Sequence, residues 1–291
     1  MSEQQDPAAA TVLEAYLGEQ VDAIAAGAMS LHQGRDAVHP TRVATRRVRS
    51  LLRVFVDLFD GEAAAALDRE LAWYAGVLGA VRERQVLRAR LSGMGDAAET
   101  GGPAAYADGD ALTTALDLID RRLCQEEGSR RAELIAALDG DRYRALAADL
   151  SRWASAPPLA PAATGAAEEL RRYVRAAGRA ADKRLARATA RPEDVEALHS
   201  ARKAAKRARY AAEVARSVLG EKAAKRSLDH YKSVQEALGE HQDSADAVST
   251  LHRLRAEAGD DAQLTAAYDA LLERERTAAR NALTQAITFV H

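Results

Sequence analysis

The sequence has little of what builds disulfide frameworks, aromatic cores or membrane spans. Cys124 is the only cysteine, which excludes an intramolecular disulfide. Aromatic residues make up 4% of the chain, and it has seven prolines. No stretch approaches the roughly 18 apolar residues of a membrane span, and the first residues lack the basic and apolar segments of an export signal. We therefore expect a cytoplasmic chain that is neither exported nor inserted in a membrane.

An excess of charge of one sign is also lacking. The chain has 41 Lys and Arg against 43 Asp and Glu, and its formal net charge is −2. Binding of nucleic acid by overall basicity is therefore disfavoured. A cationic site would have to come from a local segregation of charge.

What is abundant is alanine, within a hydrophobic fraction of 47%. Alanine is the strongest helix former, and helical periodicity runs through most of the chain, so we predict an all-α fold. Two segments interrupt it, a Gly-rich connection at 93–109 and the Pro-rich SAPPLAPAATG at 155–165. The expected helices span 7–33, 36–59, 62–91, 110–138, 141–154, 166–190, 193–218, 221–239, 241–257 and 261–290.

The two halves of the sequence are related. Residues 38–49 read VHPTRVATRRVR and residues 198–209 read LHSARKAAKRAR, at an offset of 160. The same offset matches Leu78-Gly79 with Leu238-Gly239, and Glu83 with Asp243. Two matches at one offset indicate an internal duplication. We predict two pseudo-symmetric helical bundles, at 1–155 and 166–291, joined by a linker at 156–165 into one domain.

The repeated segment predicts a basic face on each of two helices. At about 100° per residue, the cations of the first copy fall within an arc of about 80° and extend over about 21 Å. Glu213 in the second copy stands where Arg53 stands in the first. The first face has His39, Arg42, Arg46, Arg49 and Arg53, and the second has His199, Arg202, Lys206 and Arg209.

Such faces favour a polyanion as ligand. Like charges three and four residues apart on a helix repel one another, and a bound anion relieves that repulsion. The planar guanidinium fork suits phosphate, and a linear array suits a polymer of phosphates better than one small ligand. A solvated face, or a face paired with acidic helices, is the alternative that a single basic helix would favour. The recurrence of the face in both halves favours binding.

These motifs resemble the conserved histidine α-helical domain, or CHAD, family. The matching segments are VHPTRVATRRVRSLLRVF, LHSARKAAKRARY, LGAVRERQVL and LGEHQDSADA. The resemblance implies two helical bundles around a central basic channel, binding of inorganic polyphosphate, and association with polyphosphate granules. It places both basic faces in the channel, and Arg47, Arg82, Lys203, Arg207 and His241 as candidates with weaker support.

The same resemblance gives no indication of catalysis. The first Leu-Gly motif continues as Arg82-Glu83, where the family commonly has Arg-Asp. We predict a binding module without cofactor or metal. Two alternatives stay open: nucleic-acid binding through the same helices, and a role in polyphosphate or triphosphate metabolism. In the latter, Glu83 and Asp243 would be the candidate metal-holding carboxylates.

Overall fold

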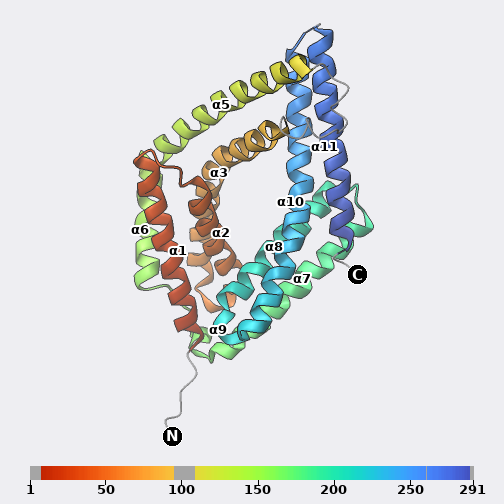
Figure 1. The fold of residues 1–291 in the computed structure, drawn as a ribbon. Coiled ribbons are helices and arrows are strands. Elements are labelled where there is room, and N and C mark those ends of the chain that lie inside the picture. Colours follow the sequence, from red (N-terminus) through yellow and green to blue (C-terminus); the bar gives the residue numbers. More distant parts are fainter. Residues whose placement is uncertain (1–7, 95–108, 260, 289–291) are drawn as a thin grey trace. The chain divides into compact units, whose positions relative to one another are not determined.

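The computed structural model describes residues 8–94, 109–259 and 261–288, and within them the chain is helical (Figure 1). The predicted connection at 93–109 lies almost wholly outside the described residues. The all-α prediction is confirmed: apart from two isolated bridges, Ala8 with Ala166 and Phe59 with Leu159, the described ranges contain no β-structure. The main helices are α1 (Ala9–His32), α2 (Val38–Val54), α3 (Gly61–Ser92), α5 (Gly109–Asp139), α6 (Asp141–Ser155), α7 (Leu170–Ala190), α8 (Val195–Val214), α9 (Arg216–Leu219), α10 (Glu221–Glu257) and α11 (Ala262–Thr288).

Three of the helix boundaries expected from the sequence are wrong. The helix expected at 193–218 ends at Val214, and the short α9 follows it. A single helix, α10, runs through position 240, where we expected one helix to end and another to begin. Glycine costs about 1 kcal/mol inside a helix, but Gly239 is buried, and packing of its neighbours outweighs that cost. The helix expected at 36–59 ends at Val54, and a short 3-10 turn follows at Val56–Leu58.

The described chain forms two compact units, each built from both halves of the sequence. The first contains residues 1–79 and 133–235, and the second contains residues 80–132 and 236–291. The units therefore differ from the predicted division into repeats at 1–155 and 166–291. That division, like the pseudo-symmetry and the channel, stays a prediction.

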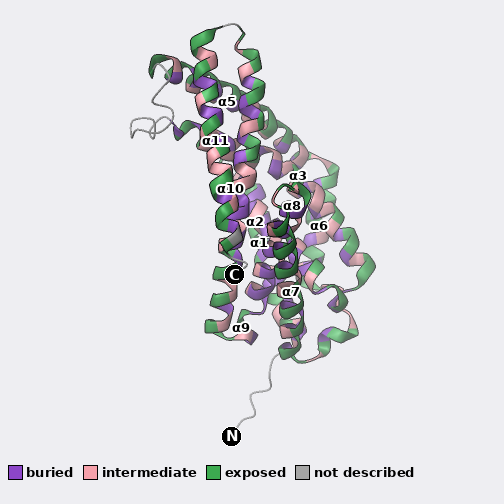
Figure 2. Ribbon diagram, turned by 90° about the vertical axis from the view of Figure 1, so that its right-hand side faces the viewer, coloured by how far each residue is buried: buried purple, intermediate pink, exposed green. Residues whose placement is uncertain are grey.

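In the first unit, α1 packs on α2, α2 on α8, and α7 on α8 (Figure 1). The α1–α2 contact is very close at Gly27, where an added Cβ would collide with Thr41 Oγ1. Buried positions recur along one side of each helix, as the purple bands in Figure 2 show. Among them, the tilted rings of Phe55 and Tyr173 have centroids 5.4 Å apart, and those of Tyr74 and Tyr143 have centroids 5.1 Å apart.

The second unit has its own apolar core. Residues from the end of α3, from α5, from the second part of α10 and from α11 form one buried cluster. Leu91, Leu123 and Leu251 are fully buried in it. Each unit therefore buries enough side chain to hold its helices together. No helix within the described ranges has both the length and the apolar character that a membrane crossing requires.

Candidate functional site

Both basic helices, α2 and α8, lie in the first unit and pack against each other. Each begins beside an acidic side chain. Asp194 accepts a hydrogen bond from the Ala197 backbone N–H at 2.9 Å, and Asp36 accepts one from the Val38 N–H at 3.4 Å. Such bonds satisfy amide groups that the first helical turn leaves without partners. The local sequence thus fixes where each basic helix starts.

Residues at equivalent positions of α2 and α8 are buried to a similar degree. From 41 to 52 and from 201 to 212, every equivalent pair except Val43 and Lys203 has the same degree of burial. Small or apolar side chains are buried, whereas the cations at equivalent positions 42 and 202, 46 and 206, and 49 and 209 are half-buried. The two helices thus have matching burial over these twelve pairs of positions, apart from that one pair.

One acidic residue balances part of the positive charge on the α2 face. Asp68 on α3 accepts from Arg49 Nε at 3.0 Å through Oδ1 and from Arg53 Nη2 at 2.8 Å through Oδ2. One carboxylate thus balances two guanidinium groups. Arg46, one turn earlier, has its Nε buried and without a hydrogen-bond partner in the described residues. His39 is exposed at the start of the helix, and Arg42 is half-buried.

The α8 face lies in a positive environment. Burial lowers the pKa of His199 below its ordinary value, and the charges of Lys203, Arg202 and Lys206 lower this pKa further. At neutral pH the imidazole is therefore mostly uncharged. The Arg202 Nε is buried without a hydrogen-bond partner among the residues described, and the Arg209 guanidinium lies over the Tyr210 ring, 4.9 Å from its centroid.

Sequence reasoning noted Glu213 but not its partners, and it did not find Asp68 as a partner of α2. Glu213 accepts from Arg47 Nη2 at 2.7 Å and from the Tyr16 hydroxyl at 3.3 Å. Nothing in the sequence pairs Asp68 with the arginines of the preceding helix, or Tyr16 with a residue 197 positions later, so these partners required the tertiary structure.

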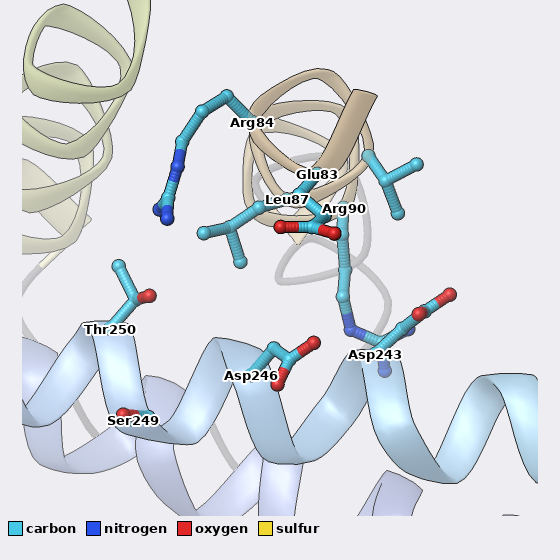
Figure 3. A pocket seen from close by; sticks show the side chains of 9 residues that line it. Glu83, Arg84, Leu87, Arg90, Asp243, Asp246, Ser249 and Thr250 are labelled. Carbon is cyan, nitrogen blue, oxygen red and sulfur yellow. The ribbon is translucent and has the colours of Figure 1, made fainter. Parts of the chain in front are cut away.

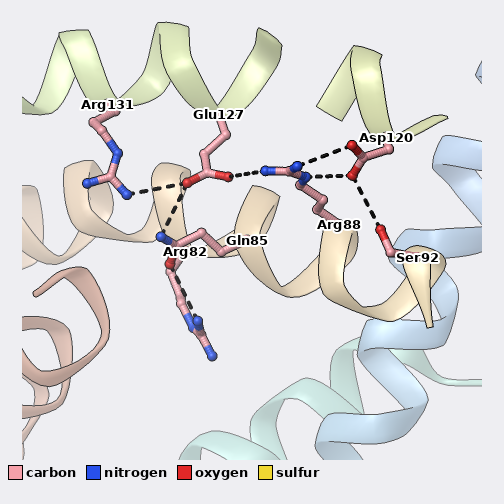
Figure 4. A network of polar contacts seen from close by, with 7 residues as sticks. All are labelled: Arg82, Gln85, Arg88, Ser92, Asp120, Glu127 and Arg131. Carbon is pink, nitrogen blue, oxygen red and sulfur yellow. Dashed lines mark hydrogen bonds and ion pairs between the residues drawn. The ribbon is translucent and has the colours of Figure 1, made fainter. Parts of the chain in front are cut away.

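Two weaker candidates, Arg82 and His241, belong to the second unit. Arg82 donates to Gln85 at 3.4 Å, and Gln85 donates to Glu127 at 3.3 Å. Figure 4 shows this network continuing along α3 and α5. His241 Nδ1 lies 3.2 Å from the Ala279 carbonyl oxygen. Both side chains have local structural contacts within their own unit.

A pocket of about 240 Å³ in the second unit brings Glu83 and Asp243 to one site. Figure 3 shows Asp246 with them, and Arg90 reaching from α3 between these acids. Arg90 is held by Glu275, with 2.8 Å between Nε and Oε2, and by Glu240 at 2.8 Å. In the described ranges, no three His, Cys, Asp or Glu side chains are arranged to hold a metal ion.

The comparisons with known proteins identify the family. The CHAD domain pattern matches residues 15–252, and the chain belongs to this family, which is related to polyphosphate and triphosphate binding. The fold resembles that of PptA from Streptomyces chartreusis, at a TM-score of 0.76 and 23% identity over 96% of this chain and 99% of that one. It also resembles the CHAD domain from the plant Ricinus communis, at a TM-score of 0.71 and 25% identity over 98% and 94%.

Two curated relatives are similar in sequence. They are the uncharacterized proteins MT2285 and Rv2226 from two Mycobacterium tuberculosis strains, CDC 1551 / Oshkosh and ATCC 25618 / H37Rv. Each is 34% identical over 216 residues, which cover 72% of this chain and 38% of the relative. The match thus spans well under half the length of either relative.

Proposed function

We propose that this protein binds inorganic polyphosphate without catalysis, through the basic faces of α2 and α8. The observation that carries the proposal is that both copies of the basic helix pack together in one compact unit with matching burial. The half-buried cations at 42, 46 and 49 of α2 and at 202, 206 and 209 of α8 raise the electrostatic potential of that region, although the whole chain is slightly negative. Membership of the CHAD family supports phosphate as the ligand group.

The donors of these rows suit a phosphate chain. Arg46 and Arg202 each have a buried Nε without a hydrogen-bond partner among the described residues. Buried donors of this kind are costly unless a ligand satisfies them. Successive phosphate groups supply acceptors and negative charge at short, regular spacing, which fits cations placed one helical turn apart.

The alternatives have less support. Aromatic residues, on which single-stranded bases would stack, make up only 4% of the chain. An enzyme acting on polyphosphate or triphosphate would need metal-holding carboxylates that face the phosphates. The carboxylate pair of Glu83 and Asp243 lies in the second unit, whereas the basic helices lie in the first.

The decisive experiment reverses one cation in each row. In Arg46→Glu with Lys206→Glu, we expect loss of binding to long-chain polyphosphate in calorimetric titration, because two attractions become repulsions. The matched control is Arg175→Glu with Lys222→Glu, which makes the same change of net charge at exposed positions on α7 and α10. Circular dichroism checks that both variants remain helical.

Three results would contradict the proposal. Unchanged affinity in the Arg46 and Lys206 variant would remove the basic helices from the site. Equal loss in the control would mean that only net charge matters. Displacement of polyphosphate by RNA or DNA at equal phosphate concentration would show that nucleic acid is the better ligand.

Association with polyphosphate granules is the cellular form of the same proposal. A fluorescently tagged chain is expected at granules, and the variant reversed at Arg46 and Lys206 is expected to be diffuse. The control reversed at Arg175 and Lys222 should still reach the granules. Granule association that survives reversal of the basic faces would show that another surface directs it.

A further inference from the structure

The pocket between α3 and α10 in the second unit contains a buried hydroxyl without a partner. Thr250 of α10 lines this pocket and is only 8% exposed. Figure 3 shows its side chain on the side of α10 that faces α3. Among the described residues its hydroxyl makes no hydrogen bond, although a threonine in a helix can donate to the carbonyl four residues earlier. A buried hydroxyl of this kind is costly unless something bound in the pocket satisfies it.

Asp246 lies one helical turn before Thr250 and directs its carboxylate into the same pocket (Figure 3). Its Oδ1 accepts a hydrogen bond from the Gln242 side-chain amide at 3.0 Å. An amide is neutral, so this bond leaves the negative charge of Asp246 unbalanced. No cation of the described residues forms an ion pair with this carboxylate. A charged acceptor and a buried hydroxyl thus lie about 6 Å apart along one side of α10.

The two arginines that line the pocket pair with carboxylates that do not line it. Arg84 Nη1 lies 3.3 Å from Glu126 Oε2. Arg90 pairs with Glu275 and with Glu240, at 2.8 Å in both cases. The other charged side chains of the pocket are all acidic, namely Glu83, Asp243 and Asp246. The pocket therefore favours a positively charged ligand over an anion.

These acceptors suit an ammonium group better than a metal ion. In the part of the chain that the structure describes, no group of three His, Cys, Asp or Glu side chains has the arrangement of a metal site. A primary ammonium has three N–H donors that point in different directions, so carboxylate and hydroxyl oxygens from separate residues can accept from it. Val86 and Leu87 line the same pocket and offer apolar contact to a short alkyl chain. The volume of about 240 Å³ is below the roughly 300–1,000 Å³ of sites for drug-sized ligands, so the ligand is small.

We propose that this pocket binds a small primary alkylamine in its ammonium form. Asp246 is the charged acceptor, the Thr250 hydroxyl is the buried acceptor, and the alkyl chain packs on Leu87. The residues that carry the proposal belong to the second unit, whereas α2 and α8 belong to the first. The proposal therefore goes beyond polyphosphate binding and does not depend on it.

The probe is 1,4-diaminobutane, a short chain with a primary ammonium at each end, in calorimetric titration of the full chain. Asp246→Asn keeps the size of the side chain and should weaken binding at least about tenfold, because a charged hydrogen bond is lost. The matched control is Asp117→Asn, the same change at an exposed position of α5, which should bind normally. The fully methylated diamine keeps both charges but has no N–H donor, and it should bind at least about tenfold more weakly.

Thr250→Val separates a role in binding from a role in folding. Loss of the hydroxyl should weaken diamine binding about three- to tenfold. The same change should leave resistance to urea unchanged or slightly higher, because the hydroxyl has no partner in the free protein. Thr250→Ser restores the hydroxyl and should recover most of the affinity.

Two results would overturn the site: no binding of the diamine by the wild type up to about 10 mM, or unaltered binding in both Asp246→Asn and Thr250→Val. Magnesium binding that is lost in Asp246→Asn would show that the pocket holds a metal ion instead of an amine. Titration of the same variants with long-chain polyphosphate reports on α2 and α8 separately, so either proposal can fail while the other stands.

Discussion

At the scale of single residues, the basic faces are defined by the acids that reach them as much as by their own cations. Asp68 balances two arginines of α2, and Glu213 balances Arg47 from the opposite helix. Arg46 and Arg202 each keep a buried Nε without a hydrogen-bond partner among the described residues, and a bound polyanion could satisfy both. The half-burial of these side chains strengthens their interaction with a bound phosphate relative to fully solvated cations.

We predict that binding of polyphosphate is coupled to protonation of His199. Its pKa is lowered by burial and by Lys203, Arg202 and Lys206, so the free protein holds this imidazole mostly neutral at neutral pH. Bound phosphates cancel the repulsion from those cations and raise the pKa again. Binding of polyphosphate should therefore take up protons, and affinity should rise as pH falls toward the pKa of the free histidine.

Calorimetric titration in two buffers of different ionisation enthalpy measures this uptake. His199→Gln should reduce it, whereas His230→Gln, an exposed histidine of α10, should not. If proton uptake is the same in the wild type and in His199→Gln, a group other than His199 takes up the proton.

At the scale of helices, small side chains set how closely the basic helices approach their neighbours. On α8 the buried positions at 201, 204, 205, 208, 211 and 212 are all alanine. On α2, Thr41 is buried against Gly27 of α1, and its hydroxyl donates to the Ala37 carbonyl at 2.6 Å. Larger residues at these positions would separate the helices and displace the cations on their other sides.

Gly27→Ala should therefore destabilise the protein. The added methyl group would collide with Thr41, and forcing α1 from α2 costs about 1–3 kcal/mol. Gly18→Ala in the same helix meets open space and should be neutral or stabilising by up to about 1 kcal/mol, because alanine favours the helix. Urea unfolding followed by circular dichroism gives both values. Equal effects of the two substitutions would mean that the α1–α2 contact does not limit stability.

At the scale of the molecule, a net charge of −2 coexists with a concentrated basic region in one unit. The rest of the surface carries an excess of acid, so attraction of polyanions falls on the α2 and α8 faces instead of on the whole protein. A phosphate chain bound there would displace its condensed counterions.

Affinity for long-chain polyphosphate should accordingly fall steeply with salt. A fourfold rise in sodium chloride concentration is expected to lower the association constant by at least about tenfold, with a shallower dependence for tripolyphosphate, which makes fewer contacts. Titrations at several salt concentrations measure both slopes. A flat dependence for the long chain would rule out charge neutralisation as the basis of binding.

The sequence by itself determined the helical fold class and the family. Alanine content and periodicity predict helices wherever burial repeats every three to four residues, and the duplicated motif identifies α2 and α8 as the helices of interest. These features are local, so they can be read along the chain. The continuous α10 was missed because a glycine weakens a helix locally, whereas packing of the surrounding residues decides whether the helix continues.

Only the tertiary structure decided which carboxylates pair with Arg47, Arg49 and Arg53. Asp68 is separated from Arg49 by 19 residues, and Tyr16 from Glu213 by 197. No periodicity encodes such pairings, because they depend on how whole helices pack. The substitution of Glu213 for an arginine was visible in the sequence, but its partner was not. Contact between helices distant in the chain turned that single difference into an ion pair of Glu213 with Arg47, to which the Tyr16 hydroxyl also donates.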